Sequence, residues 1–85
     1  MRVISQHGNV DLPYEQIVVC HAMESVIALY NGEKYVLGEY SSKEKAYKAM
    51  KMLREVWINE AIEFTHGIYH RNIVFQFPQD YEIEV

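Results

Sequence analysis

The fold of this 85-residue chain is decided by the stretch SVIALYNGEKYVLGEY, residues Ser25 to Tyr40. Asn31 and Gly32 supply the positive φ angles of a type I′ turn, so the β-rich segments on either side of them pair antiparallel. A turn of this kind also fixes the register of the two strands, because a slip would move every side chain to the opposite face. The hairpin is therefore the anchor of a predicted β-sheet.

Strand patterns also precede this hairpin. Residues 2–5 and 10–12 alternate apolar and polar side chains around the turn sequence of residues 6–9, and Pro13 stops the second segment. This pattern predicts another hairpin. The continuous apolar run of residues 17–20 is typical of a central strand that is covered on both faces.

A long helix follows the second hairpin. Ser41 and Glu44 form a capping box, in which the Ser41 hydroxyl accepts the Glu44 amide hydrogen and the Glu44 carboxylate accepts the Ser41 amide hydrogen. Gly67 is the expected stop, because glycine adopts a left-handed cap at little cost. Apolar positions between these limits recur at helical spacing, at Ala46, Met50, Leu53, Trp57 and Phe64.

These elements predict one α+β domain over residues 1–85. It consists of a small antiparallel sheet of about four to six strands, packed against one long helix in the C-terminal half of the chain. A final short strand is expected at residues 73–77, before Pro78.

The apolar pattern changes in the second half of the helix. Ile58 and Ile62 continue the face that is polar in the first half, so the helix carries apolar groups on two sides. One thin sheet cannot cover both sides. Either the helix bends or breaks near Asn59, or these isoleucines meet a second subunit. A homodimer would then use Ile58, Ile62 and Trp57, with a place in the core as the alternative for Trp57.

Charge and cysteine content exclude several classes of partner. Eight Lys and Arg against twelve Asp and Glu give a net charge of −4, which repels nucleic-acid backbones, although a well-placed arginine can still bind a small anion. Cys20 is the single cysteine and cannot form an internal disulfide. No apolar run is long enough to cross a membrane, so we expect a cytoplasmic protein.

The sequence contains no recognisable catalytic centre. Cys20 and His21 are adjacent in a predicted strand and point to opposite faces, so they cannot pair, and Cys20 is expected in the core. His66 and His70 have helical spacing for a metal, but Gly67 lies between them and no further ligand is near, so we expect surface histidines. We therefore predict no enzymatic activity, no metal and no cofactor.

The segment after the helix is the most polar-aromatic part of the chain. The rings of Tyr69 and His70 can stack on a base, Arg71 can bind a phosphate, and Asn72 can read a base edge. Loops of this composition often carry binding sites. A simple connecting turn is the alternative interpretation.

Several stretches resemble small proteins encoded by phages and prophages of Gram-positive bacteria. They are MRVISQ with Gly8, DLPYE at residues 11–15, the helical residues 46–54, and FQFP at residues 75–78. Among such proteins the chain is most similar to the anti-Thoeris sponges, which bind cyclic ADP-ribose-type immune signals and hold them without cleavage.

This resemblance implies a homodimeric sponge that acts in the host cytoplasm on a nucleotide signal, with pockets formed where subunits meet. Tyr69 or Tyr30 would then stack on adenine, while Arg71 and Arg54 would pair with the pyrophosphate. The residues themselves leave two other functions open. One is a protein-binding module that inhibits or regulates a host or phage protein through a sheet edge or the helix face of Ile58 and Ile62. The other is a metal-dependent enzyme that uses His66 and His70.

Overall fold

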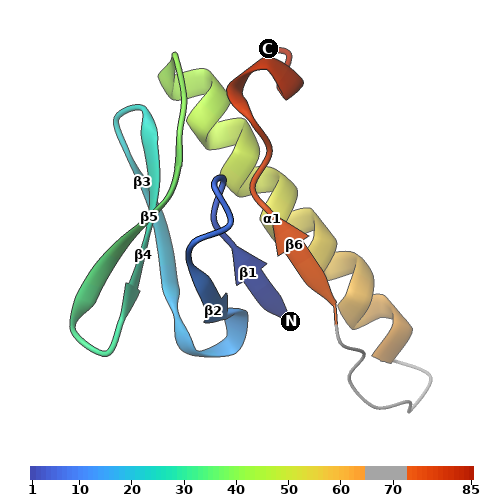
Figure 1. Ribbon diagram of the computed structural model, residues 1–85. Coiled ribbons are helices and arrows are strands. Elements are labelled where there is room, and N and C mark those ends of the chain that lie inside the picture. Colours follow the sequence, from blue (N-terminus) through green and yellow to red (C-terminus); the bar gives the residue numbers. More distant parts are fainter. Residues whose placement is uncertain (65–72) are drawn as a thin grey trace.

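The computed structural model describes residues 1–64 and 73–85, with side chains described for residues 1–59 and 73–85. The described strands form two three-stranded sheets, ordered β2-β1-β6 and β3-β4-β5, and α1 packs against the second sheet (Figure 1). The elements in chain order are β1 (Arg2–Ile4), β2 (Asp11–Pro13), the 3₁₀ helix η1 (Tyr14–Gln16), β3 (Val18–Ala22), β4 (Ser25–Tyr30), β5 (Glu33–Glu39), α1 (Lys43–Phe64), β6 (Val74–Gln76) and the 3₁₀ helix η2 (Asp80–Glu82).

The hairpin of β4 and β5 is confirmed. Asn31 and Gly32 have φ angles of 50° and 79°, as a type I′ turn requires, and Tyr30 pairs with Glu33 beside the turn. The register shifts between Val26 and Ile27, where β5 contains a bulge. Such a bulge increases the local twist of the sheet.

The first hairpin is confirmed as well, but it belongs to a separate sheet. β1 and β2 pair antiparallel, with Val3 opposite Leu12, and β6 joins the other side of β1 in parallel, with Val3 opposite Phe75. The α+β class and the final strand are therefore confirmed. The strands divide between two sheets because β1 receives the C-terminal strand as its second neighbour, in place of a strand of the central hairpin.

The prediction of a central strand at residues 17–20 is wrong. Among the described strands, β3 lies at the edge of its sheet, next to β4 only, because β5 occupies the other side of β4. Its residues range from half-buried to exposed, and Cys20 is half-buried where a core position was expected. The apolar run therefore lies in an edge strand, with alternate side chains on the two faces of the sheet.

The start of α1 differs from the predicted capping box. The helix begins at Lys43, and the Ser42 hydroxyl accepts the backbone N–H of Lys45 at 3.2 Å. The Ser41 N–H instead donates to Oδ1 of Asp80 at 2.8 Å. A carboxylate distant in the chain, Asp80, therefore takes the hydrogen bond that the local sequence assigned to the Glu44 carboxylate.

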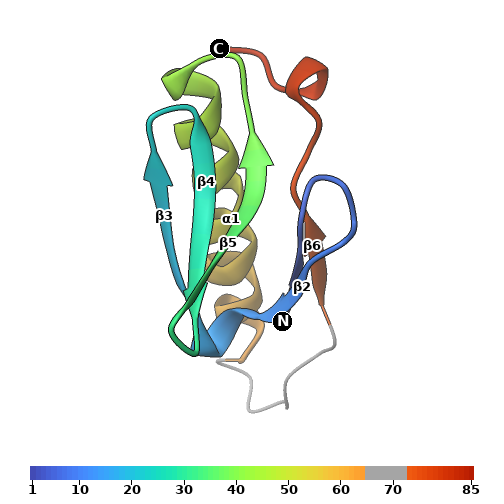
Figure 2. The same ribbon diagram turned by 60° about the vertical axis from the view of Figure 1, so that its left-hand side comes forward.

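The core lies between α1 and both sheets. α1 contributes Ala46, Ala49 and Leu53, each 1% exposed or less, and the small alanines allow the helix to approach the sheet closely. Figure 2 shows α1 behind the β3-β4-β5 sheet. α1 runs as one element from Lys43 to Phe64, so a break near Asn59 is not observed.

Gln6 joins the two sheets. Its N–H donates to the Leu37 carbonyl at 2.7 Å, and its buried side chain accepts the Glu39 N–H at 3.1 Å and donates to the Glu39 carbonyl at 3.2 Å. The same amide nitrogen lies 3.2 Å from the Pro78 carbonyl. One side chain therefore connects the end of β1, the end of β5 and the C-terminal segment.

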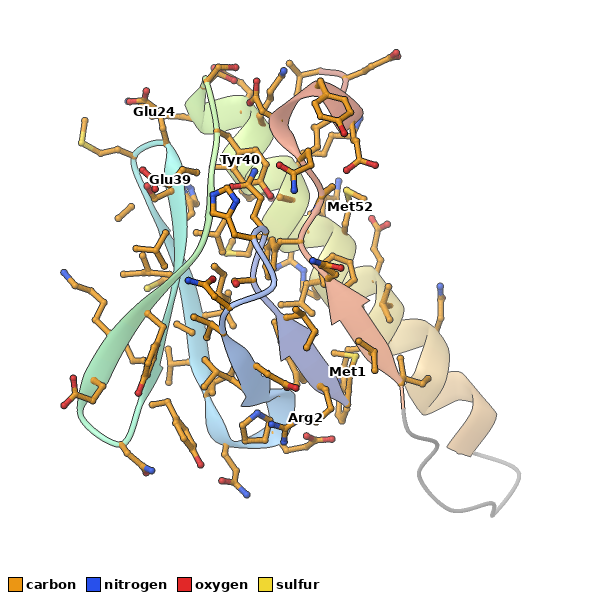
Figure 3. The ribbon with its side chains drawn as sticks, in the orientation of Figure 1. Met1, Arg2, Glu24, Glu39, Tyr40 and Met52 are labelled. Carbon is orange, nitrogen blue, oxygen red and sulfur yellow. The ribbon has the colours of Figure 1, made fainter. Side chains whose placement is uncertain are left out.

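Tyr40 closes the same junction, and its ring lies beside the end of β5 (Figure 3). Its hydroxyl donates to the Pro78 carbonyl at 2.8 Å. Burial, and then the nearby carboxylates of Asp80 and Glu82, raise the pKa of this hydroxyl well above its ordinary value. A Cβ at Gly38 would lie only 2.8 Å from the Tyr40 ring, so glycine is needed there for the ring to pack over β5.

Candidate functional site

The outer face of the β3-β4-β5 sheet, opposite α1, is the most distinctive surface in the described part of the chain. The strand registers assemble it from two cross-strand rows: Val18, Leu29 and Lys34 in one row, and Cys20, Ile27 and Val36 in the other. Alternate residues, including Val19, Val26 and Ala28, point to the opposite side and pack toward α1.

This face is apolar and open. Val18 is 60% exposed, Val36 48% and Leu29 43%, so the described elements leave it uncovered. An antiparallel sheet with one face in the core normally carries polar side chains on the other face. Lys34 is the one charged side chain in the two rows. We name these six residues the open sheet face.

The ligand residues expected from the sequence are only partly described. Tyr69, His70, Arg71 and Asn72 lie outside the described residues. Arg54 is exposed and borders a hollow of about 120 Å³, which is also lined by Tyr14, Val19, Met50 and Leu53. This volume is below the ~300 Å³ at which ligand pockets begin.

Tyr30 does not line the hollow beside Arg54. It is half-buried near the end of β4, and its hydroxyl lies 3.4 Å from Oε1 of Gln16. Tyr30 and Arg54 are therefore not brought into one pocket by the described residues.

The predicted interface residues have different surroundings. Ile58 is 50% exposed on α1. Trp57 is half-buried, and its ring stacks at a tilt on Tyr14 with 4.9 Å between ring centres. Much of its surface is therefore used within the chain. Ile62 lies in α1, and its side chain is outside the described set.

The described residues form neither a cluster of metal-ligating side chains nor a pair between Cys20 and His21. They contain no group of three or more His, Cys, Asp and Glu side chains suited to a metal ion, and His66 and His70 lie outside them. Cys20 lies in an outer-face row, whereas the ring of His21 contacts that of Tyr47 on α1 with 5.9 Å between centres. The two side chains thus serve opposite faces.

A larger groove, of about 290 Å³, lies along the solvent side of α1. It is lined by Glu44, Tyr47, Lys48, Lys51, Met52, Glu55 and Val85. Most of these are long charged side chains on an exposed helix surface, which lose side-chain entropy when a ligand orders them. The groove is therefore a poor preformed binding site.

No known protein family, curated protein or solved structure matches this chain. In the described residues, no helix combines the length and apolar character needed to cross a bilayer.

Sequence reasoning missed the open sheet face, although a signal for it existed. Once the Asn31-Gly32 turn fixes the register, Ile27 and Val36 are opposite each other, as are Leu29 and Lys34. The apolar character at both odd and even positions of residues 26–29 then predicts that both faces are apolar. Such a pattern does not distinguish a face that is covered from one that is open.

Proposed function

We propose that this chain is a protein-interaction module that binds a partner protein through the open sheet face, and so inhibits or regulates it. This proposal is based on the exposure of Val18, Leu29 and Val36 on one antiparallel sheet. Contiguous exposed apolar surface of this kind marks interaction sites in soluble proteins. Binding of this kind requires no catalytic group.

The occupant that fits this face is an amphipathic helix of the partner. A sheet is stable when a second layer covers its apolar face, and α1 already covers the inner face of this sheet. Three strands at a spacing of ~4.8 Å are about as wide as one helix of ~10 Å diameter. Lys34 at one end of its row favours an acidic residue at the rim of the partner helix.

The test compares lysine substitutions on and off the face. Leu29→Lys and Val36→Lys place a charge at the apolar centre, whereas His7→Lys places the same charge on an exposed turn outside the sheet. Proteins from cells that express the chain are captured on each purified variant. The expected partner is retained by the unmodified chain and by His7→Lys, and it is lost from both face variants.

Direct titration of the purified pair completes the test. We expect a negative heat-capacity change, which is the signature of apolar burial, and at least a ~30-fold weaker complex for Leu29→Lys. The proposal fails when no protein is captured by His7→Lys and lost from the two face variants. It also fails when a captured partner binds His7→Lys and both face variants with equal affinity.

Sequestration of a nucleotide immune signal, of cyclic ADP-ribose type, is the second candidate function. It is favoured by one arrangement in the described residues: the exposed residue Arg54 and the aromatic residue Tyr14 line the same hollow. A guanidinium binds phosphate and an aromatic face stacks on a base. The resemblance to phage sponges supports the same ligand class, with Tyr30, Tyr69, His70, Arg71 and Asn72 as further candidates.

This second candidate is tested by thermal shift with a panel of linear and cyclic adenine dinucleotides. Sequestration predicts stabilisation, loss of that stabilisation in Arg54→Ala, and release of intact ligand after heat denaturation of the protein. Recovery of a cleaved ligand would indicate an enzyme instead. An unchanged melting temperature with every nucleotide would remove this candidate.

A further inference from the structure

We infer that two copies of this chain pair through the free edge of β3, with a two-fold axis at Cys20, to form one continuous six-stranded sheet. The edge is perpendicular to the open sheet face, so this pairing is independent of the proposed function. It joins the open sheet faces of the two copies into one platform.

β3 lacks the protection that edge strands usually carry. Within the described residues β3 pairs only with β4, and its outer side faces away from the β2-β1-β6 sheet (Figure 2). Its five residues, Val18–Ala22, include no Lys, Arg, Asp, Glu or Pro. Such residues, together with bulges, are what natural proteins use to prevent edge-to-edge pairing, and the bulge of this sheet is in β5.

The hydrogen-bond pattern shows which backbone groups of β3 are available. The Tyr40 N–H donates to the Glu24 carbonyl at 2.9 Å, which makes the pair of Ser25 and Glu39 a non-hydrogen-bonded one. Ser25 therefore directs its backbone groups toward Ala22 on β3. Because these roles alternate along a strand, Val19 and His21 direct their N–H and C=O groups to the free edge.

An antiparallel second copy satisfies these groups when the register is centred on Cys20. Val19 then faces the partner's His21 in a hydrogen-bonded pair, and Val18 faces the partner's Ala22. This is the register that pairs all five residues of both strands. At the centre, Cys20 meets its own copy in a non-hydrogen-bonded pair, where side chains are closest.

The side of α1 next to β3 indicates that the binding partner at the β3 edge is a second copy of this chain. Tyr47, Arg54 and Ile58 lie within ~40° of one another around the helix axis. Tyr47 contacts His21, and Arg54 lines a hollow with Val19. Since Val19 faces the partner's His21, the two-fold axis brings Arg54 opposite the partner's Tyr47. Each dimer thus gains two guanidinium–aromatic contacts from surfaces that are exposed in one copy.

The size of the contact sets the expected strength. The paired edge is ~17 Å long, and the sheet edge and helix together are ~20 Å high, so each copy contributes about 340 Å² and the interface is smaller than those of stable complexes. We therefore expect a dissociation constant in the micromolar range and a monomer at high dilution. Pairing at this edge also shelters part of Val18 and Ile58, which are 60% and 50% exposed in one copy.

Sedimentation velocity over a wide concentration range tests the pairing. The expected result is a reversible rise to twice the 10.0 kDa mass of one chain. Val19→Pro removes an N–H that faces the free edge, so the ladder to β4 is kept while dimerisation is lost. Val19→Thr keeps that N–H and the branched shape, and it is expected to dimerise like the unmodified chain.

Disulfide formation tests the register without relying on a destabilising variant. Added diamide accepts two protons and two electrons from the two Cys20 thiols, which then form one S–S bond between copies. A non-hydrogen-bonded pair has its Cα atoms ~4.5 Å apart, within the range that a disulfide spans. In the double variant Cys20→Ser with Ala22→Cys, the two introduced thiols lie on the same face but ~14 Å apart, so rapid cross-linking is expected only for Cys20.

Arg54→Ala tests the flank contact. We expect at least a ~10-fold weaker dimer, because each dimer loses two guanidinium–aromatic contacts. A monomer at millimolar concentration, or a dimer in which Cys20 cross-links no faster than the thiol introduced by Ala22→Cys, would overturn the inference. Because Val19→Pro leaves the open sheet face in place and Leu29→Lys leaves the edge in place, failure of the pairing is distinguishable from failure of the proposed function.

Discussion

Met23 holds its backbone in the left-handed region, with a φ of 56°, at the tip between β3 and β4. For a residue with a Cβ this conformation costs about 1–2 kcal/mol. The side chain is 68% exposed, so few contacts in the chain offset that cost. The hairpin forms nevertheless, because the neighbouring Glu24 carbonyl accepts the Tyr40 N–H at 2.9 Å and ties the tip to the end of β5.

Met23→Gly is therefore expected to stabilise the protein by about 0.5–1 kcal/mol, because glycine adopts this φ without strain. Urea denaturation followed by circular dichroism measures the change. Glu24→Gly is the matched control: it adds the same flexibility to the unfolded chain at a residue without positive φ, so it is expected to destabilise. Equal effects of the two substitutions would show that Met23 is not strained.

At the scale of elements, Asp80 attaches η2 to the start of α1. Its carboxylate accepts the Ser41 N–H at 2.8 Å and lies 3.4 Å from Nζ of Lys45. The backbone hydrogen bond from Ser41 is the main cause that lowers the pKa of Asp80 below its ordinary value, with Lys45 contributing further. The folded state consequently binds this proton less readily than the unfolded state.

This pKa shift predicts a pH dependence of stability. The stability that Asp80 contributes to the folded state is fully present above the ordinary pKa of 3.8. It is lost as the pH falls through the lower pKa that Asp80 has in the folded state. Asp80→Asn keeps an oxygen acceptor for Ser41 but does not titrate. Thermal melts from neutral to acid pH should therefore show a smaller loss for Asp80→Asn than for the unmodified chain. Parallel curves would contradict this role.

At the scale of the whole molecule, the sheets depend on a buried amide. Gln6 is 5% exposed, and its side chain makes hydrogen bonds to both backbone groups of Glu39 and to the Pro78 carbonyl. A buried N–H or C=O that loses its partner costs about 1–3 kcal/mol. Since strands from both ends of the chain meet here, the two sheets are expected to unfold together.

Gln6→Met preserves side-chain volume and removes these hydrogen bonds, so we expect a loss of about 2–4 kcal/mol in unfolding free energy. Gln76→Met is the matched control, because Gln76 is exposed and its amide makes a 3.3 Å hydrogen bond to the Ser5 carbonyl. Its expected cost is below ~1 kcal/mol. Comparable losses in urea denaturation would mean that Gln6 does not hold the junction.

The sequence by itself determined the local elements of this protein. Asn31 and Gly32 specify the turn of the main hairpin, Pro13 ends β2, and the spacing of Ala46, Leu53 and Trp57 specifies one helix. Each depends on neighbours in the chain, whose geometry is set by backbone sterics and side-chain periodicity. The α+β class follows from their order.

Only the tertiary structure decided how these elements meet. The pairing of β1 with β6, the edge position of β3, and the transfer of the Ser41 N–H to Asp80 all join residues that are distant in the chain. An apolar run such as residues 17–20 has the same pattern whether the protein covers it or leaves it open. Which of its sides remains exposed, and is free to bind, depends on the competition among strands for neighbours.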